Sequence, residues 1–214
     1  MNIVLLGPPA SGKGTQARLL AKSLNLYHFQ TGDLSRKLAE KDPRIRKIIN
    51  SGKLIPEQEM TMYVIDSLSR RGDMRNILFE GFPRFISQYE ALKSFLDNKD
   101  DDIDAVVYLK VSQAEAVKRI SSRRICVKCG RIYNLITNPP ASGACKCGGK
   151  LVQRDDDKPE SVKIRFKYYF DNTKKLLDYL APRGFLIEVD GERPIEAIHK
   201  DILRILKEKF HAKN

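Results

Sequence analysis

Short apolar runs alternate along the chain with longer segments in which apolar residues recur every three or four positions. The runs predict strands at residues 3–6, 27–30, 76–80, 105–109 and 185–189. Strands that are apolar along most of their length are typical of a parallel sheet buried on both faces. The pattern therefore predicts an α/β fold, in which a five-stranded parallel sheet carries helices on both faces.

The periodic segments predict the helices. They cover residues 16–22, 34–38, 44–50, 56–68, 89–96, 114–123, 159–180 and 194–210. Thr31 or Asp33 is expected to cap the second of these helices, because a short polar side chain there accepts from exposed backbone amides. Residues 30–59 thus form a helical insert between two strands, whereas cysteine, glycine, proline and other turn residues dominate residues 126–149.

A glycine-rich loop at residues 7–15 separates the first strand from the first helix. Backbone amides of such a loop and the positive end of the helix dipole hold phosphate groups, and Lys13 adds a full charge. The strict pattern has Ser or Thr directly after the lysine, but here Gly14 intervenes and Thr15 supplies the hydroxyl. Gly7, Thr31 and Gly81 all follow strand ends, so the parallel sheet places them on one rim, where such folds bind ligands.

The chain carries 39 Lys and Arg against 27 Asp and Glu, and its formal charge of +12 favours anionic partners. The basic residues are spread along the sequence, and acidic runs at 100–102 and 155–157 interrupt them. Charge alone therefore does not choose between a nucleotide and a polynucleotide. No apolar stretch approaches the ~20 residues of a membrane span, and the first residues predict a strand and not a secretory leader. We expect a cytoplasmic protein without a membrane partner.

All four cysteines lie in one segment, as Cys126-x2-Cys129 and Cys145-x-Cys147. Clustering of every thiol in one segment favours a metal site over a disulfide, and four thiolates suit a structural Zn2+. A reactive redox pair and plain buried thiols remain the alternatives. The three histidines, His28, His199 and His211, are scattered, and we interpret them as structural or surface residues.

Further motifs follow the loop in a fixed order. They are Thr31-Gly32-Asp33 with Arg36, Gly81-Phe82-Pro83-Arg84 with Gln88, Arg119 with Arg123, the cysteine segment, Arg154-Asp155-Asp156, Arg165, and Asp190-Gly191. Together they resemble the adenylate kinase family, in its long bacterial form, over essentially the full length of the chain. The resemblance implies an enzyme that transfers the terminal phosphoryl group of ATP to AMP with Mg2+ and gives two ADP.

The resemblance also implies how the chain is divided. A core of residues 1–29, 60–123 and 161–214 carries an AMP-binding insert at 30–59 and a small zinc-ribbon-like lid at 124–160. The implied ATP-binding residues are Ala10, Ser11, Gly12, Lys13, Gly14, Thr15, Arg119, Arg123, Ile132, Tyr133 and Arg193. The implied AMP-binding residues are Thr31, Arg36, Lys53, Leu54, Ile55, Gly81, Phe82, Pro83, Arg84, Gln88, Arg154 and Arg165. In the lid the resemblance implies zinc at Cys126, Cys129, Cys145 and Cys147.

The catalytic residues implied by the resemblance are cations. They are Lys13, Arg84, Arg123, Arg154 and Arg165. A guanidinium group matches phosphate oxygens with two parallel hydrogen bonds and keeps its charge, so arginines suit a reaction that moves a phosphoryl group. Gln88 is expected to read adenine, because an amide both donates and accepts.

Four positions depart from the family's pattern. Ala10 stands where glycine is usual, so a left-handed backbone there would be strained. Gln30 stands where Ser is common, and Glu80 replaces the usual Asp before Gly81 with a side chain one methylene longer. The second cysteine pair is one residue shorter than in many relatives, which leaves the fourth metal ligand open.

Two other functions remain open. A kinase for another monophosphate, UMP or CMP, is disfavoured by Gln88 and by the long cysteine-bearing lid. A zinc-ribbon nucleic-acid-binding protein would explain the charge and the cysteines, but it leaves the arginines without a role. We expect ATP, AMP and ADP as partners, no nucleic acid, and a monomer.

Overall fold

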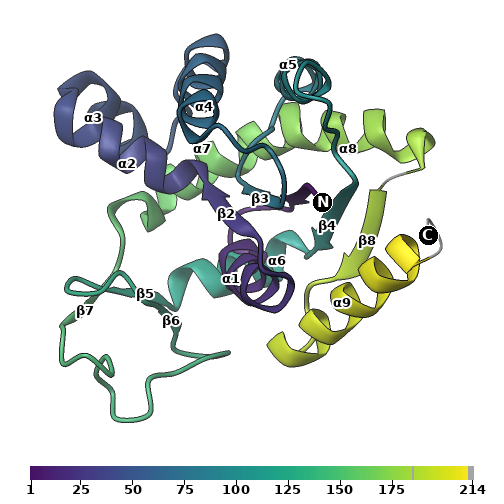
Figure 1. Cartoon of the computed structure of the whole chain (residues 1–214). Coiled ribbons are helices and arrows are strands. Elements are labelled where there is room, and N and C mark those ends of the chain that lie inside the picture. The colour runs from purple at the N-terminus through teal and green to yellow at the C-terminus, as the bar shows by residue number, and fades with distance from the viewer. Residues whose placement is uncertain (185, 212–214) are drawn as a thin grey trace.

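The computed structural model describes residues 1–184 and 186–211. Five parallel strands form its central sheet, in the order β2-β3-β1-β4-β8 (Figure 1). They are β1 (Ile3–Leu6), β2 (Tyr27–Gln30), β3 (Ile77–Glu80), β4 (Ala105–Lys110) and β8 (Leu186–Asp190). The predicted α/β fold is confirmed. Phe185, the predicted start of the last strand, lies outside the described residues.

Helices cover both faces of this sheet (Figure 1). They include α1 (Lys13–Leu24), α4 (Glu57–Arg71), α5 (Ile86–Asp97), α6 (Gln113–Ser121), α7 (Pro159–Tyr168), α8 (Lys174–Leu180) and α9 (Ile195–His211). Val4 and Leu6 of β1 pack with α4, α5 and α8. Ile3 and Leu5 pack on the opposite face with α1 and α9. Because strand side chains alternate between faces, an apolar strand supplies two cores at once.

The helical insert contains α2 (Thr31–Lys41) and α3 (Pro43–Asn50), at the upper left of Figure 1. It has a small apolar cluster of its own around Ala39, Ile45 and Ile55. The predicted capping of α2 by Thr31 or Asp33 is wrong. The helix begins at Thr31 itself, and the Thr31 hydroxyl donates to the carbonyl oxygen of Glu80 at 3.1 Å instead. Thr31 thereby ties the start of the insert to the end of β3.

The lid, residues 124–160, lies at the lower left of Figure 1 and contains an antiparallel sheet in the order β6-β5-β7. Its strands are β5 (Arg123–Cys126), β6 (Ile132–Asn134) and β7 (Leu151–Val152). The predicted helix to Arg123 is wrong at its end, because Arg123 pairs with Asn134 in this sheet. The buried apolar side chains of the lid are those of Cys126, Tyr133 and Cys145, so the lid has little core.

The long helix predicted at 159–180 is interrupted. A π-helical turn, Tyr169–Thr173, separates α7 from α8, and short 3-10 turns, Asp155–Asp157 and Ala181–Arg183, flank the segment. The turn buries Tyr169 and Thr173, and the Tyr169 hydroxyl lies 2.9 Å from the hydroxyl of Tyr108 in β4. Both buried residues lie beside the cleft described below.

Among the helices that the structure describes, none is both long and apolar enough to cross a bilayer. The cytoplasmic location stays a prediction, as does the division of the chain into core, insert and lid.

Candidate active site

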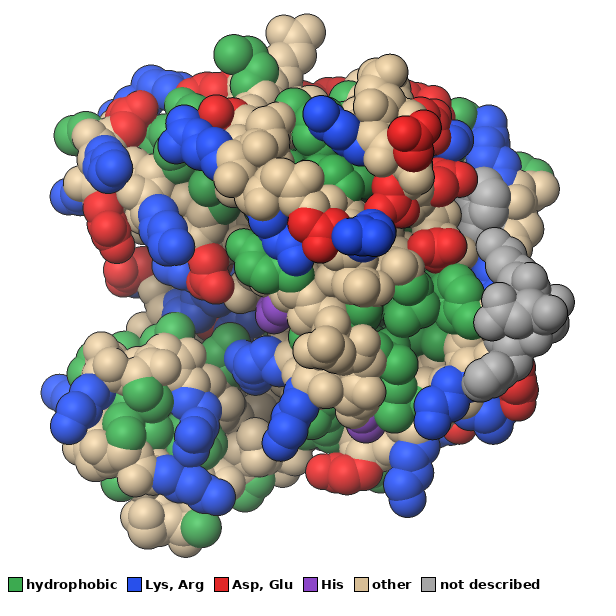
Figure 2. Space-filling model, viewed as in Figure 1, with side chains coloured by type: hydrophobic (Ala, Val, Ile, Leu, Met, Phe, Trp, Pro, Cys, Tyr) green, Lys and Arg blue, Asp and Glu red, His purple; other side chains and the backbone are tan. Residues whose placement is uncertain are grey.

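One cleft of about 880 Å³ opens where the strands of the central sheet end. The helical insert, the lid and the core all contribute to its walls. Figure 2 shows the surface indented between the lid at the lower left and the body above it. Every residue that the sequence predicts to bind nucleotide lines the cleft, except Pro83, which follows Phe82 through a cis peptide bond. The structure therefore brings the predicted site together.

The phosphate loop, residues 7–15, turns tightly into α1. Gly12, at the start of α1, has φ +93°, and its carbonyl oxygen accepts from the amides of Thr15 and Gln16, both at 3.0 Å. Ala10 has φ +58°, in the left-handed region that costs a residue with a Cβ atom ~1–2 kcal/mol. The expectation of strain at Ala10 is confirmed.

The ammonium group of Lys13 is folded into the loop. It donates to the carbonyl oxygens of Gly7 at 2.8 Å and Pro8 at 2.7 Å. Burial lowers the pKa of Lys13 from 10.5 to about 7, with repulsion from Arg84 adding to the shift and Glu80 opposing it. The side chain of Lys13 therefore gains or loses its charge near neutral pH.

Glu80 stands at the end of β3 with its carboxylate against the phosphate loop. A Cβ atom added to Gly14 would lie 3.1 Å from Oε1 of Glu80, so the longer arm of this residue reaches the first turn of α1. The other oxygen, Oε2, lies 2.8 Å from Nε2 of His28 in β2. The interpretation of His28 as a structural residue missed this contact. The contact follows from the strand register, because β2 and β3 are neighbours and Gln30, two residues after His28, lies opposite Glu80.

The segment after β3 is shaped by close contacts. Gly81 has φ +82°, and a Cβ atom there would lie 2.6 Å from Oγ1 of Thr31, so only glycine fits. Nε of Arg84 donates to the carbonyl oxygen of Gly81 at 2.8 Å, and burial lowers the pKa of Arg84.

Gln88 is 2% exposed, and both the oxygen and the nitrogen of its side-chain amide form hydrogen bonds. Its Oε1 accepts from the backbone amide of Arg84 at 2.9 Å, and its Nε2 donates to the carbonyl oxygen of Glu57 at 3.3 Å. Gln88 therefore links the segment after β3 to the start of α4, at the wall shared with the helical insert.

Three arginines converge on two neighbouring carboxylates. Arg154 donates to Asp156 from Nε and Nη2, both at 2.8 Å, and Nη1 of Arg165 lies 3.3 Å from the same carboxylate. Arg123 and Arg165 both donate to Asp157, whose side chain is 0% exposed. Burial, together with repulsion from Arg123, lowers the pKa of Arg165 to about 10.

The sequence prediction did not include these two acids as partners of the arginines. The acidic run that follows Arg154 is the signal that points to them. With both carboxylates buried or nearly so, they hold the planes of the guanidinium groups in fixed positions at the cleft.

Arg119 and Arg193 lie at the opposite end of the cleft from the helical insert, where the loop after β8 meets α9. Arg119 donates to Glu115 at 2.7 Å and to the carbonyl oxygen of Gly191 at 2.8 Å. Arg193 forms an ion pair of 2.6 Å with Asp201 of α9.

Of the lid residues implied for ATP, Ile132 and Tyr133 both line the cleft. The hydroxyl of Tyr133 is turned toward the cysteines, however, and donates to Sγ of Cys145 at 3.5 Å. Arg36, on the insert, pairs with Asp33 one helical turn before it.

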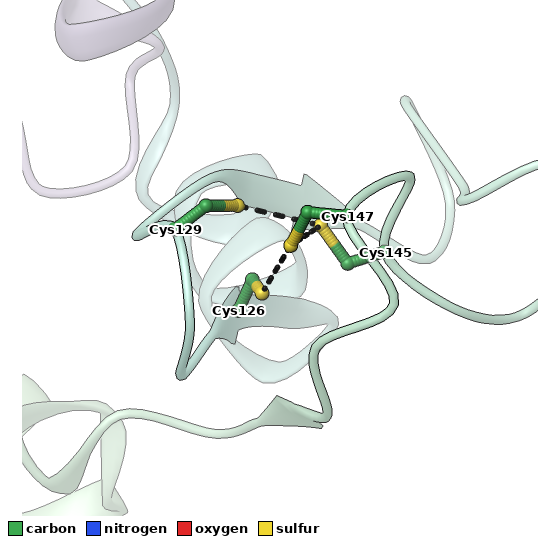
Figure 3. A group of neighbouring side chains, drawn as sticks. All are labelled: Cys126, Cys129, Cys145 and Cys147. Carbon is green, nitrogen blue, oxygen red and sulfur yellow. Dashed lines mark hydrogen bonds between the residues drawn. The ribbon is translucent and has the colours of Figure 1, made fainter.

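The four thiols point toward a common centre (Figure 3). All four sulfur atoms lie within 4.8 Å of one another, and adjacent sulfurs are 3.4–3.5 Å apart. A tetrahedral metal with bonds of ~2.3 Å requires sulfurs about 3.8 Å apart. The short second pair therefore places Cys147 with the other three thiols, and the set fits a metal ion.

Comparison with known proteins agrees with this geometry. A sequence model described as adenylate kinase matches residues 5–185. Adenylate kinase of Thermosipho africanus is 40% identical over 213 residues, which cover 97% of this chain and 100% of that protein. The adenylate kinases of Kosmotoga olearia and Archaeoglobus fulgidus are 38% and 39% identical, each over 97% of this chain and at least 98% of their own length.

Proposed function

Because this chain belongs to the adenylate kinase family, we propose that the two ends of its cleft hold ATP and AMP in line for phosphoryl transfer. The enzyme moves the terminal phosphoryl group of ATP to AMP and gives two ADP. The observation that carries the proposal is that Lys13, Arg84, Arg123 and Arg165 all line one cleft of about 880 Å³, to which the helical insert, the lid and the loop after β8 all contribute. Neither rival function, a UMP or CMP kinase or a nucleic-acid-binding zinc ribbon, finds support in the comparisons.

ATP occupies the wall made by the phosphate loop, the lid and the loop after β8. The amides of residues 10–15 and the ammonium group of Lys13 bind its phosphates, since a helix N-terminus and a lysine suit an anion. Arg119 and Arg193 flank its adenine. These two side chains are already fixed by Glu115 and Asp201, which supports a preformed base site.

AMP occupies the wall made by the helical insert and the end of β3. Arg36 and Arg84 bind its phosphate, and Gln88 reads its adenine, with Thr31 and residues 53–55 completing the site. Gln88 is suited to this role because its amide is oriented by two backbone groups, the amide of Arg84 after β3 and the carbonyl oxygen of Glu57 at the start of α4.

The transfer step needs alignment, exclusion of water and neutralisation of charge rather than covalent chemistry by the protein. Arg123, Arg154 and Arg165 neutralise the migrating group from the lid side. Asp156 and Asp157 position these arginines. Their negative charges also offset the repulsion between the neighbouring guanidinium groups.

Mg2+ enters with ATP and supplies charge neutralisation on the phosphates. Thr15 would hold it through the hydroxyl, and Glu80 would hold its water ligands. The fit is supported by the carboxylate of Glu80, which reaches the first turn of α1 beside Gly14. His28 then acts on Glu80 from behind as a positioning residue.

Zn2+ is the metal proposed for the lid, held by Cys126, Cys129, Cys145 and Cys147. Its role is structural, because four thiolates leave no open position and no histidine lies among them. A lid with three buried apolar side chains needs such a crosslink to fold.

The reaction itself requires no nucleic acid, membrane or second subunit, and we propose that a monomer carries it out. The test is a coupled assay of ADP formation from ATP with AMP, UMP or CMP, with and without Mg2+. The proposal predicts ADP formation with AMP alone among the three and only with Mg2+. Faster turnover with UMP or CMP would overturn the specificity, and no turnover with any monophosphate would overturn the activity.

A further inference from the structure

Charge is distributed unevenly along the lid, because the four acidic residues of 124–160 all lie at 155–160. Between residues 121 and 154 the chain carries seven basic residues and no acidic one. The seven are Arg123, Arg124, Lys128, Arg131, Lys146, Lys150 and Arg154. The segment therefore supplies seven of the twelve net positive charges of the chain, so the even spread of charge expected from the whole sequence does not hold here.

Five of these seven residues do not line the cleft, and one of the five, Arg124, is only partly exposed and donates to the backbone carbonyls of Ser121 and Arg123. We call Lys128, Arg131, Lys146 and Lys150 the basic tip: all four are exposed, and none lines the cleft. Within the described part of the chain none of the four forms an ion pair, whereas lysines on the core such as Lys93 do. Four thiolates on Zn2+ would carry a net charge of −2, so the four cations of the tip would exceed the charge of the proposed metal site and leave a positive surplus at its surface.

The cysteine cluster holds the basic tip together. Lys128 lies between Cys126 and Cys129, and Lys146 lies between Cys145 and Cys147. A Cβ atom on Gly149 would lie 2.7 Å from Cβ of Lys128, and the amide of Val127 donates to the carbonyl oxygen of Lys150 at 3.0 Å.

Arg131 joins the group through Tyr133. Tyr133 interacts with the side chain of Arg131, and its hydroxyl also accepts from the backbone amide of Lys146 at 3.3 Å. Figure 2 shows basic side chains over the visible face of this lobe and no acidic ones. The four cations therefore occupy one compact end of the lid.

We propose that the basic tip binds the phosphate backbone of a nucleic-acid duplex, outside the catalytic cleft. The density of positive charge favours this partner, because four cations on one small segment match the closely spaced phosphates of a duplex. The only aromatic side chain of the lid, Tyr133, is 5% exposed, so the tip lacks the stacking surface with which proteins hold single strands. Binding is expected to be independent of base sequence, because contacts to phosphates carry no sequence information.

The proposal predicts how strongly the affinity for a duplex falls as the salt concentration rises. Each phosphate neutralised on a duplex contributes about −0.9 to the slope of log K against log salt, so four contacts predict a slope of about −3.6. If the duplex were instead bound by net charge spread over the whole surface, removing cations from the core would weaken its affinity as much as removing them from the basic tip.

The experiment measures anisotropy of a short fluorescent duplex, as DNA and as RNA, with the full-length protein over a range of salt. The lid variant combines Lys128→Glu, Lys146→Glu and Lys150→Glu. The matched control combines Lys99→Glu, Lys163→Glu and Lys175→Glu, which are exposed on the core and also lie off the cleft, so both variants change the net charge equally. Turnover of ATP and AMP is measured for all three proteins.

The expected result is that the lid variant loses at least about tenfold in affinity at low salt, that the control loses much less, and that turnover is unchanged in both. Saturating ATP, added without AMP, should leave duplex binding in place. Equal weakening by the two variants would overturn the proposal, as would displacement of the duplex by ATP or tighter binding of a single strand. An absence of binding at low salt would overturn it as well, and none of these outcomes touches the phosphoryl transfer proposed above.

Discussion

Arg123 donates a hydrogen bond of 2.8 Å from Nε to the carboxylate of Asp157, which is fully shielded from solvent. Arg165 donates to the same carboxylate at 3.1 Å. One buried acid thus fixes two cations at the cleft, one from the start of the lid and one from α7. The relationship explains how like charges are kept close together before any phosphate binds.

Replacement of this acid tests its positioning role. Asp157→Asn keeps the shape but removes the carboxylate that compensates Arg123, and it leaves Arg165 with Asp156 alone. Removing one partner of a buried ion pair costs ~3–5 kcal/mol. We expect the free energy of unfolding to fall by about this amount in chemical denaturation. The loss should shrink when ATP is present, because its phosphates restore the missing negative charge. A loss of the same size with and without ATP would contradict the role.

Loss of an arginine at the transfer site is expected to abolish most turnover. Arg123→Ala should lower kcat ~10³-fold or more, because a positioned arginine supplies ~10³–10⁵ in phosphoryl transfer. Circular dichroism should show the fold intact. Arg124→Ala is the matched control, since Arg124 is the adjacent arginine, donates to the backbone carbonyls of Ser121 and Arg123, and does not line the cleft formed by the described residues. Near-normal turnover of Arg123→Ala would remove this residue from its role.

Base recognition is expected to depend on Gln88. Gln88→Ala should raise the KM for AMP about tenfold, the value of roughly one hydrogen bond, and should change the KM for ATP much less. The same substitution frees the backbone amide of Arg84 and the carbonyl oxygen of Glu57, so denaturation should be measured in parallel. Equal effects on the two nucleotides would show that Gln88 serves the fold and not the base.

The buried ammonium group predicts proton uptake. Burial lowers the pKa of Lys13 to about 7, with Arg84 contributing, so the amine is mostly neutral at pH 8. ATP phosphates favour the charged form, so binding at pH 8 should take up about 0.9 proton, and binding at pH 6 almost none. Calorimetry in buffers with different ionisation enthalpies measures this uptake. Lys13→Arg, which stays charged, should show none, and uptake in that variant would assign the proton elsewhere.

The same shift fixes the sign of a stability effect. Between pH 7 and the ordinary pKa of 10.5, the unfolded chain binds a proton on Lys13 that the folded chain does not. The contribution of Lys13 to stability is therefore unfavourable below pH 7, and the penalty disappears as the pH rises through that window. Comparison of wild type with Lys13→Met across the window isolates this contribution.

Removal of the lid metal should loosen the lid before the core. Structural zinc supplies ~10–16 kcal/mol in small domains, and the lid has few buried apolar side chains to replace it. After complete chelation, limited proteolysis should cut within residues 124–160 first, while the core sheet stays protected. The variant Cys147→Ser should behave like the chelated protein. Unchanged cleavage after complete metal removal would argue against a structural site.

Local sequence determined much of this molecule. Apolar runs predicted the five strands of the central sheet, because strands such as β1 and β3 are buried on both faces and this signal needs no knowledge of neighbours. The three short strands of the lid were not predicted. The phosphate loop was equally clear, since its glycines and Lys13 lie together in the chain. The strain at Ala10 was expected from the resemblance, because the family's pattern has glycine at this position. The cysteine spacing indicated a metal site, because both pairs of thiols are local.

Contacts between distant segments were decided only by the tertiary structure. No periodicity shows that Glu80 meets His28, that two acids after Arg154 hold Arg123 and Arg165, or that α6 ends where the lid sheet begins. The reason is physical: a pattern along the chain reports which face of an element is buried, whereas the partner on that face is chosen by packing. Sequence therefore determined the elements and the chemistry available at their ends, and the fold decided which charges neutralise one another.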